Sequence, residues 1–68
     1  MYSFRKELSN EIKERYKARS IAKTVGITEG YLSQILQSGK TCSKKTAYAI
    51  TKTLDEDAEI EDFFIRNK

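Results

Sequence analysis

The stretch SIAKTVGITEGYLSQILQSGK, residues 20–40, carries a helical apolar pattern that a single glycine interrupts. The apolar residues at helical spacing on its two sides are Ile21, Ala22, Val25, Leu32 and Ile35. Gly26 directly follows the first group, and a glycine at that place is typical of a helix C-terminus because it adopts positive φ at little cost. The pattern therefore predicts two short helices, about residues 19–25 and 28–37, joined by a tight turn.

Two helices separated by about three turn residues form the layout of a helix-turn-helix. A residue as small as Ala22 allows the second helix to cross close over the first, and Ile27 is expected to fill the corner between them. Thr28 is a good N-cap for the second helix. The residues left on its outer face are Thr28, Glu29, Gly30, Ser33, Gln34 and Gln37. They are mostly short and polar, as the reading of base edges in a major groove requires.

The N-terminal part of the chain also shows helical spacing. One apolar stripe predicts a first helix over about residues 3–16, with Ser3 as its N-cap. The residues of this stripe are Phe4, Leu8, Ile12 and Tyr16.

After a loop at residues 37–42, Ser43 is expected to cap a further helix over about residues 43–54, with Ala47, Ile50 and Leu54 facing inward. The last residues, 58–68, offer Ile60, Phe63 and Phe64 for a short fifth helix or a docked end. There is no proline and there are only three glycines. The expected fold is all-α: one compact domain of four to five helices over residues 1–68.

Charge is distributed unevenly along the chain. Residues 1–54 hold eleven Lys or Arg against four acids, a net charge of +7, whereas residues 55–68 hold two against six, a net charge of −4. A basic body with an acidic end favours a nucleic-acid partner, and a solvated charged surface is the plain alternative.

Composition argues against several other classes. The single cysteine, Cys42, excludes an internal disulfide, and the absence of His leaves no zinc ligand set and no evident catalytic or metal site. No cofactor and no enzymatic activity are expected. No apolar run approaches the roughly 20 residues that span a membrane, and the N-terminus is too charged for a signal peptide. A cytoplasmic protein that does not contact a membrane is expected.

Residues 18–54 resemble the helix-turn-helix of Cro and repressor-type phage regulators, the XRE family. The positions that carry the resemblance are Ala22, Gly26, Ile27, Leu32, Ser33, Ile35 and Gly39. The resemblance implies a lambda-repressor-like fold with its helix-turn-helix at about residues 19–37. Ala18 departs from the pattern, because many members carry a phosphate-contacting Gln there; here Lys17 and Arg19 flank the position.

The resemblance also implies roles for individual residues. The base-facing residues would be Thr28, Glu29, Gly30, Ser33 and Gln34. Gln34 would pair with adenine, and Glu29 would either accept from a cytosine amino group or only stabilise the helix N-terminus. The residues expected at DNA phosphates are Arg19, Lys23, Tyr31, Gln37, Lys40, Lys44 and Lys45. For Tyr31, packing against the first helix is the alternative, and Lys13 is expected on a solvated face.

The expected function is that of a sequence-specific transcriptional regulator that binds double-stranded operator DNA, in the manner of a Cro-like repressor. Two protomers would read half-sites about one helical turn apart. The partner would be a second copy, or a repressor in a heterodimer. The alternative is an antirepressor or another protein-binding module on the same scaffold. It is favoured by the acidic end, by an exposed Phe64 and by Ala18 in place of the usual Gln. For Cys42, a partly buried residue and a redox-sensing thiol are the two readings.

Overall fold

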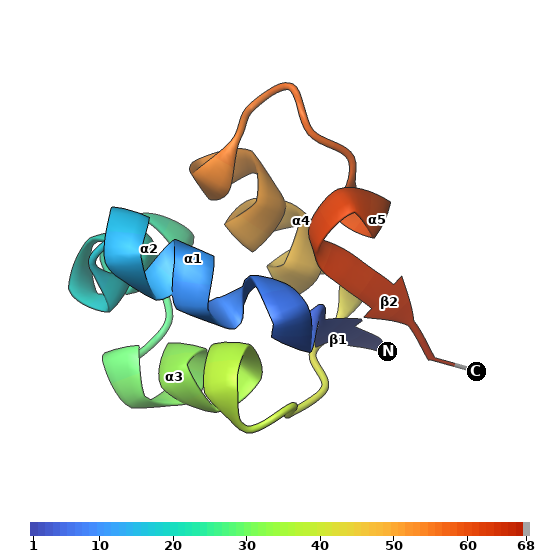
Figure 1. The fold of residues 1–68 in the computed structure, drawn as a ribbon, viewed down its shortest axis with the longest axis horizontal. Coiled ribbons are helices and arrows are strands. Elements are labelled where there is room, and N and C mark those ends of the chain that lie inside the picture. Colours follow the sequence, from blue (N-terminus) through green and yellow to red (C-terminus); the bar gives the residue numbers. More distant parts are fainter. Residues whose placement is uncertain (68) are drawn as a thin grey trace.

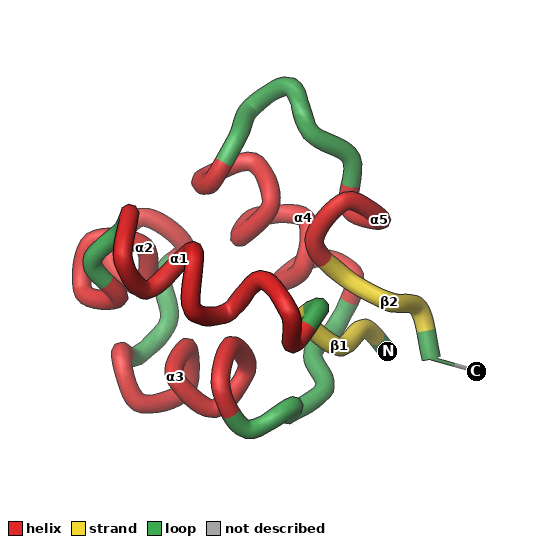
Figure 2. Tube along the Cα trace, in the orientation of Figure 1, coloured by secondary structure: helices red, strands yellow, loops and turns green. Residues whose placement is uncertain are grey.

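A computed structural model describes residues 1–67. Over these residues the protein is 63% helical, with five helices and a small two-stranded antiparallel sheet. The elements follow one another as β1 (Tyr2–Phe4), a 3-10 turn η1 (Lys6–Leu8), α1 (Ser9–Arg15), α2 (Ala18–Val25), α3 (Glu29–Gln37), α4 (Lys44–Leu54), α5 (Ile60–Phe63) and β2 (Phe64–Arg66) (Figures 1 and 2).

The turn between α2 and α3 has the predicted chemistry. Gly26 adopts the left-handed conformation, with φ of 87°. The N–H of Ile27 donates to the carbonyl of Ala22 at 3.0 Å, which closes the Schellman-type end of α2. The hydroxyl of Thr28 then accepts from the N–H of Tyr31 at 3.1 Å and caps α3. The predicted helix boundaries on the two sides of the turn are therefore confirmed to within a residue.

The hydrophobic core joins α2, α3, α4 and the sheet. Leu32, Ile35, Ile50 and Phe64 are fully buried. Ala22 is also buried, and α2 packs against both α3 and α4. The second predicted cap is confirmed, since the N–H of Thr46 donates to the Ser43 hydroxyl at 3.3 Å. These contacts pack the inner face of α3 against the core, and its opposite face is exposed to solvent.

The prediction of one helix over residues 3–16 is wrong at its N-terminal end. Tyr2–Phe4 is an extended strand, and α1 begins only at Ser9, after the turn η1. The reason is non-local: Tyr2 exchanges two backbone hydrogen bonds with Cys42, at 2.8 and 2.9 Å, and β1 pairs with β2. Ser3 caps no helix; its hydroxyl accepts from the side-chain amide of Asn67 at 2.6 Å.

The C-terminal part of the chain packs against the core, so Phe64 is not exposed as expected from the sequence. Phe64 is fully buried and lies opposite Phe4 in the sheet register, whereas Phe63 is only half-buried. The expectation of an exposed Phe64 is therefore wrong, and the protein-binding alternative loses that support. Burial of an aromatic ring of this size is a large favourable term in so small a core.

No helix within residues 1–67 has the length and apolar character needed to cross a membrane.

Candidate functional site

The exposed side of α3 follows from its buried side. Leu32, Ile35 and Leu36 face the core, and successive residues turn by about 100° around a helix axis. The positions opposite the core are therefore Gly30, Gln34 and Gln37, all of them exposed. We call these three residues the crest of α3. The crest presents two amide side chains, which both donate and accept hydrogen bonds.

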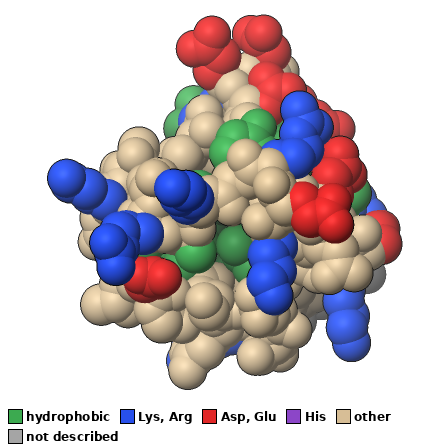
Figure 3. Space-filling model, turned by 60° about the vertical axis from the view of Figure 1, so that its left-hand side comes forward, with side chains coloured by type: hydrophobic (Ala, Val, Ile, Leu, Met, Phe, Trp, Pro, Cys, Tyr) green, Lys and Arg blue, Asp and Glu red, His purple; other side chains and the backbone are tan. Residues whose placement is uncertain are grey.

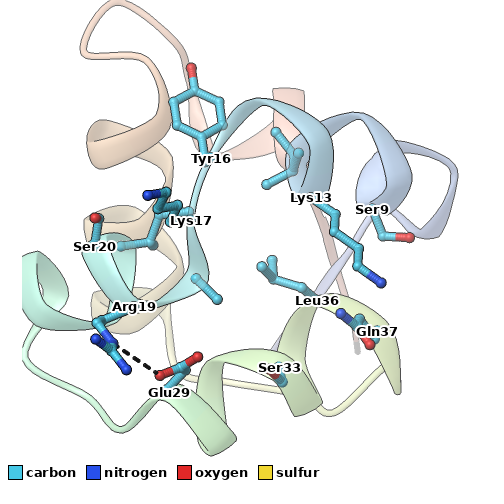
Figure 4. A pocket seen from close by; sticks show the side chains of 13 residues that line it. Ser9, Lys13, Tyr16, Lys17, Arg19, Ser20, Glu29, Ser33, Leu36 and Gln37 are labelled. Carbon is cyan, nitrogen blue, oxygen red and sulfur yellow. Dashed lines mark ion pairs between the residues drawn. The ribbon is translucent and has the colours of Figure 1, made fainter.

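A groove lies along one flank of the crest, between α1, the start of α2 and α3 (Figure 4). Its volume is about 660 Å³. The wall that α3 contributes includes Glu29, Ser33 and Gln37. The floor contains Ile12, Ile21 and Leu36. Figure 3 shows this face of the molecule, with apolar side chains at the bottom of a hollow and Lys or Arg side chains around it.

Three cationic side chains line the groove, namely Lys13 of α1, Lys17 before α2 and Arg19 of α2. Lys13 is exposed, as expected for the solvated face of the first helix, and it also lines the groove together with Ser33 and Gln37. A sequence signal for it exists: Lys13 and Lys17 are four residues apart and flank the junction between two helices. That spacing alone does not say which other helix they approach.

An ion pair crosses from α2 to α3 at one end of the groove. Arg19 Nε lies 3.8 Å from Glu29 Oε2, drawn as the dashed line in Figure 4. Both side chains are exposed, at 88% and 57%. The two residues that were predicted to contact a phosphate and a base therefore contact each other in the free protein.

The opposite flank of α3 carries Tyr31 and Lys40. The ammonium of Lys40 lies 5.6 Å from the centroid of the Tyr31 ring, a cation–π contact. Gly39, with φ of 72°, turns the chain between α3 and Lys40. Tyr31 is half-buried and packs against the core. It is not among the residues that line the groove between α1 and α3, so its packing against the first helix stays a prediction.

The remaining predicted phosphate residues divide into two places. Lys44 and Lys45 are exposed in the first turn of α4, which contains no acidic residue to neutralise its N-terminus. Lys23 is exposed in the last turn of α2 and is not among the described residues that line the groove. The structure thus brings Arg19, Glu29, Ser33 and Gln37 to one groove and leaves Lys23 apart.

Three acidic residues of the C-terminal part lie away from this surface. Asp55, Glu56 and Asp57 occupy the loop between α4 and α5, at the top of Figure 1, whereas α3 lies at the bottom. The charge asymmetry of the sequence is therefore also a spatial asymmetry. A polyanion that approaches α3 meets cations first and keeps its distance from this acidic loop.

Cys42 is 1% exposed and is held in the backbone bridge to Tyr2. Burial raises the pKa of its thiol, and the nearby N-terminal ammonium opposes this only in part. A thiol with these properties is a packing residue and not a reactive thiolate, so the redox-sensor reading is not supported. Within residues 1–67, no group of three or more potential ligands is placed to hold a metal ion.

Comparison of the chain with protein-family models, with curated proteins and with solved structures finds no match. What the site can do follows from its own side chains: an exposed helix with amide groups on its crest and cationic groups on both flanks.

Proposed function

We propose that this protein is a sequence-specific DNA-binding transcriptional regulator that places α3 in the major groove. The observation that carries the proposal is the crest of α3, which presents Gln34 and Gln37 between cationic groups on both sides. A major groove about 12 Å wide admits one helix, and the phosphate strands then lie along both flanks of that helix.

Gln34 is the residue proposed to read a base. Its amide is exposed on the crest and is able to pair with adenine through N6 and N7. Ser33, one residue earlier, is half-buried on the groove side and is proposed as a supporting contact. Thr28 is proposed to begin the reading surface, although its hydroxyl already serves as the cap of α3.

Gly30 supports a close approach of the DNA. A Cβ built at this position would meet no atom within 4 Å, so the fold itself does not require a glycine there. Glycine in an exposed helix costs roughly 1 kcal/mol relative to alanine. A glycine that is costly and sterically unnecessary in the free protein is explained if the partner backbone comes close at this point.

Phosphate contacts are proposed on both flanks. Lys40, Lys44 and Lys45 lie after α3 and in the first turn of α4, whose free N–H groups also favour an anion. Arg19 lies on the groove flank, and further candidates are Gln37 on the crest and Tyr31 on the flank of Lys40. Lys23 is the member of the set that lies in the last turn of α2, outside the groove. The resemblance to Cro and repressor-type regulators implies the same arrangement, with two protomers on adjacent half-sites.

The proposal is tested by titrating the protein against its own upstream DNA and against a random-sequence duplex at several salt concentrations. We expect preference for the upstream duplex and a steep loss of affinity with salt. Gln34→Ala should reduce the preference by roughly tenfold, since one bidentate base contact contributes about 1–3 kcal/mol of discrimination.

A second variant distinguishes contacts to DNA phosphates from contacts to bases. Changing Lys44 and Lys45 together to Ala should weaken both duplexes equally and reduce the salt slope by about 2. Lys6→Ala, at an exposed lysine of the turn η1, is the matched control and should change neither quantity by more than a lost surface charge does. Equal and weak binding of both duplexes by the unmodified protein would contradict the proposal.

A further inference from the structure

Glu29 does not point where a base reader on α3 would point. It lies about 100° around the helix axis from Gly30, toward the groove and away from the crest. Its carboxylate lies 3.8 Å from the guanidinium of Arg19, which is in the first turn of α2. The residue that would accept from a cytosine is therefore engaged with a cation of its own chain.

The same pair changes what Arg19 offers to DNA. Of the three cations that line the groove, Arg19 is the one whose charge an acid of the chain opposes. In the part of the chain that the structure describes, Lys13 and Lys17 form no ion pair within 4.0 Å. A phosphate that approaches Arg19 meets the Glu29 carboxylate as well, so attraction and repulsion largely cancel at this end of the groove.

We propose that Glu29 masks Arg19 electrostatically and thereby lowers the affinity for duplex DNA of any sequence. Glu29 is on this account a positioning residue that acts through Arg19, and it reads no base. The inference rests on the proposed function for its ligand, DNA, but it concerns the level of binding and not the choice of sequence. The crest of α3 is proposed to determine which DNA sequence the protein prefers.

A matched control for this proposal exists on α1. Arg15 Nη1 lies 3.4 Å from Glu11 Oε1, and both side chains are exposed, at 66% and 58%. Neither residue lines the groove beside α3. Glu11→Gln and Glu29→Gln therefore remove the same charge from the same kind of pair, at two different places.

The experiment measures the affinity of four variants for a random-sequence duplex across a salt series: Glu29→Gln, Glu11→Gln, Arg19→Ala, and Arg19→Ala combined with Glu29→Gln. We expect Glu29→Gln to raise affinity about two- to fivefold above the Glu11→Gln value, the range that an exposed ion pair supports. Its salt slope should steepen by about 0.9, one additional phosphate contact. Arg19→Ala alone should lower affinity, because it leaves the Glu29 carboxylate without its cation. The double variant should bind no more tightly than the unmodified protein.

Three results would overturn the proposal. An equal effect of Glu29→Gln and Glu11→Gln would show only a change in net charge. A double variant that still binds more tightly than the unmodified protein would show that the gain of Glu29→Gln does not come through Arg19. A selective loss of affinity for upstream DNA in Glu29→Gln, with random DNA unchanged, would make Glu29 a base reader.

Failure of the proposed function gives a different pattern. A protein that binds upstream and random duplexes equally is no sequence-specific regulator, yet the difference between Glu29→Gln and Glu11→Gln still decides whether Arg19 is masked. The ion pair can also be tested without DNA. The nuclear magnetic resonance signal of the Arg19 Nε–H group should differ between the unmodified protein and the Glu29→Gln variant. An unchanged signal would also contradict the proposal that Glu29 masks Arg19.

Discussion

The rings of Phe4 and Phe64 pack edge to face, with 5.3 Å between their centroids and 80° between their planes. The two residues are opposite each other in the pairing of β1 with β2, so this contact closes the two ends of the chain over the helices. Phe63 stacks on the outer side of Phe4, with 6.4 Å between centroids. The ends of this chain are thus part of the core that holds α3 in place.

Phe64→Ala is expected to destabilise the protein by about 3–5 kcal/mol, because it removes a fully buried ring from a small core. Urea unfolding followed by circular dichroism measures the loss. Ile65→Ala, at the next residue of the same strand, changes a side chain that is 46% exposed and should cost far less. Similar losses for the two variants would show that the aromatic pair does not anchor the chain end.

Gly26→Ala and Gly30→Ala should have opposite effects on stability. A Cβ at either position meets no atom within 4 Å, so the two substitutions differ in backbone conformation and not in steric contact. Gly26 has φ of 87°, and an alanine there should cost about 1–2 kcal/mol. Alanine in place of Gly30 should add about 0.5–1 kcal/mol. Thermal unfolding of the two variants tests both predictions. An equal shift in Tm would contradict the claim that the two glycines differ in backbone conformation.

Gly30→Ala should also separate stability from binding. The variant is expected to be more stable and yet to bind upstream DNA less tightly, because the added methyl group stands on the crest of α3 where the DNA approaches. Duplex titration of the two proteins at one salt concentration provides the measurement. Unchanged or improved affinity would mean that no backbone comes close to this position.

Thr28→Ala should destabilise the protein by about 1 kcal/mol, since the Thr28 hydroxyl accepts from the N–H of Tyr31 at the start of α3. Thr28→Ser keeps the accepting oxygen and should restore most of the loss. Chemical denaturation of the three proteins gives the comparison. A serine variant as unstable as the alanine variant would assign the effect to the lost methyl group and not to the cap.

Stability should fall with alkaline pH through Cys42. Burial raises the pKa of this thiol in the folded protein, whereas the unfolded chain ionises near its ordinary value of about 8.5. Below that value both states carry the proton and the contribution is fully present. As pH rises from there through the higher pKa of the folded state, the unfolded chain releases the proton first and stability is lost.

Cys42→Ala isolates this contribution from the lysines and tyrosines that titrate in the same range. The variant should be less stable at neutral pH, because it loses a buried side chain, but its stability should decline less between pH 7 and pH 10. Urea unfolding at a series of pH values provides both curves. Parallel curves for the two proteins would show that the thiol contributes nothing to the pH dependence.

The sequence by itself determined the local features around the turn: helices near residues 19–25, 28–37 and 43–54, the caps Thr28 and Ser43, and the positive φ of Gly26. Each depends on residues at most a few positions apart. Helical periodicity, hydroxyl caps and the conformational freedom of glycine all act over that range, so the pattern of the chain suffices to predict them.

Tertiary structure alone decided the rest. A three-residue strand such as Tyr2–Phe4 has no periodicity that distinguishes it from the start of a helix, and its hydrogen bonds come from Cys42 and from β2. The same holds for the groove that brings Lys13 to α3 and for the choice of Phe64 over Phe63 as the buried ring. These features depend on contacts between segments far apart along the chain, and only the packing of the helices brings those segments together.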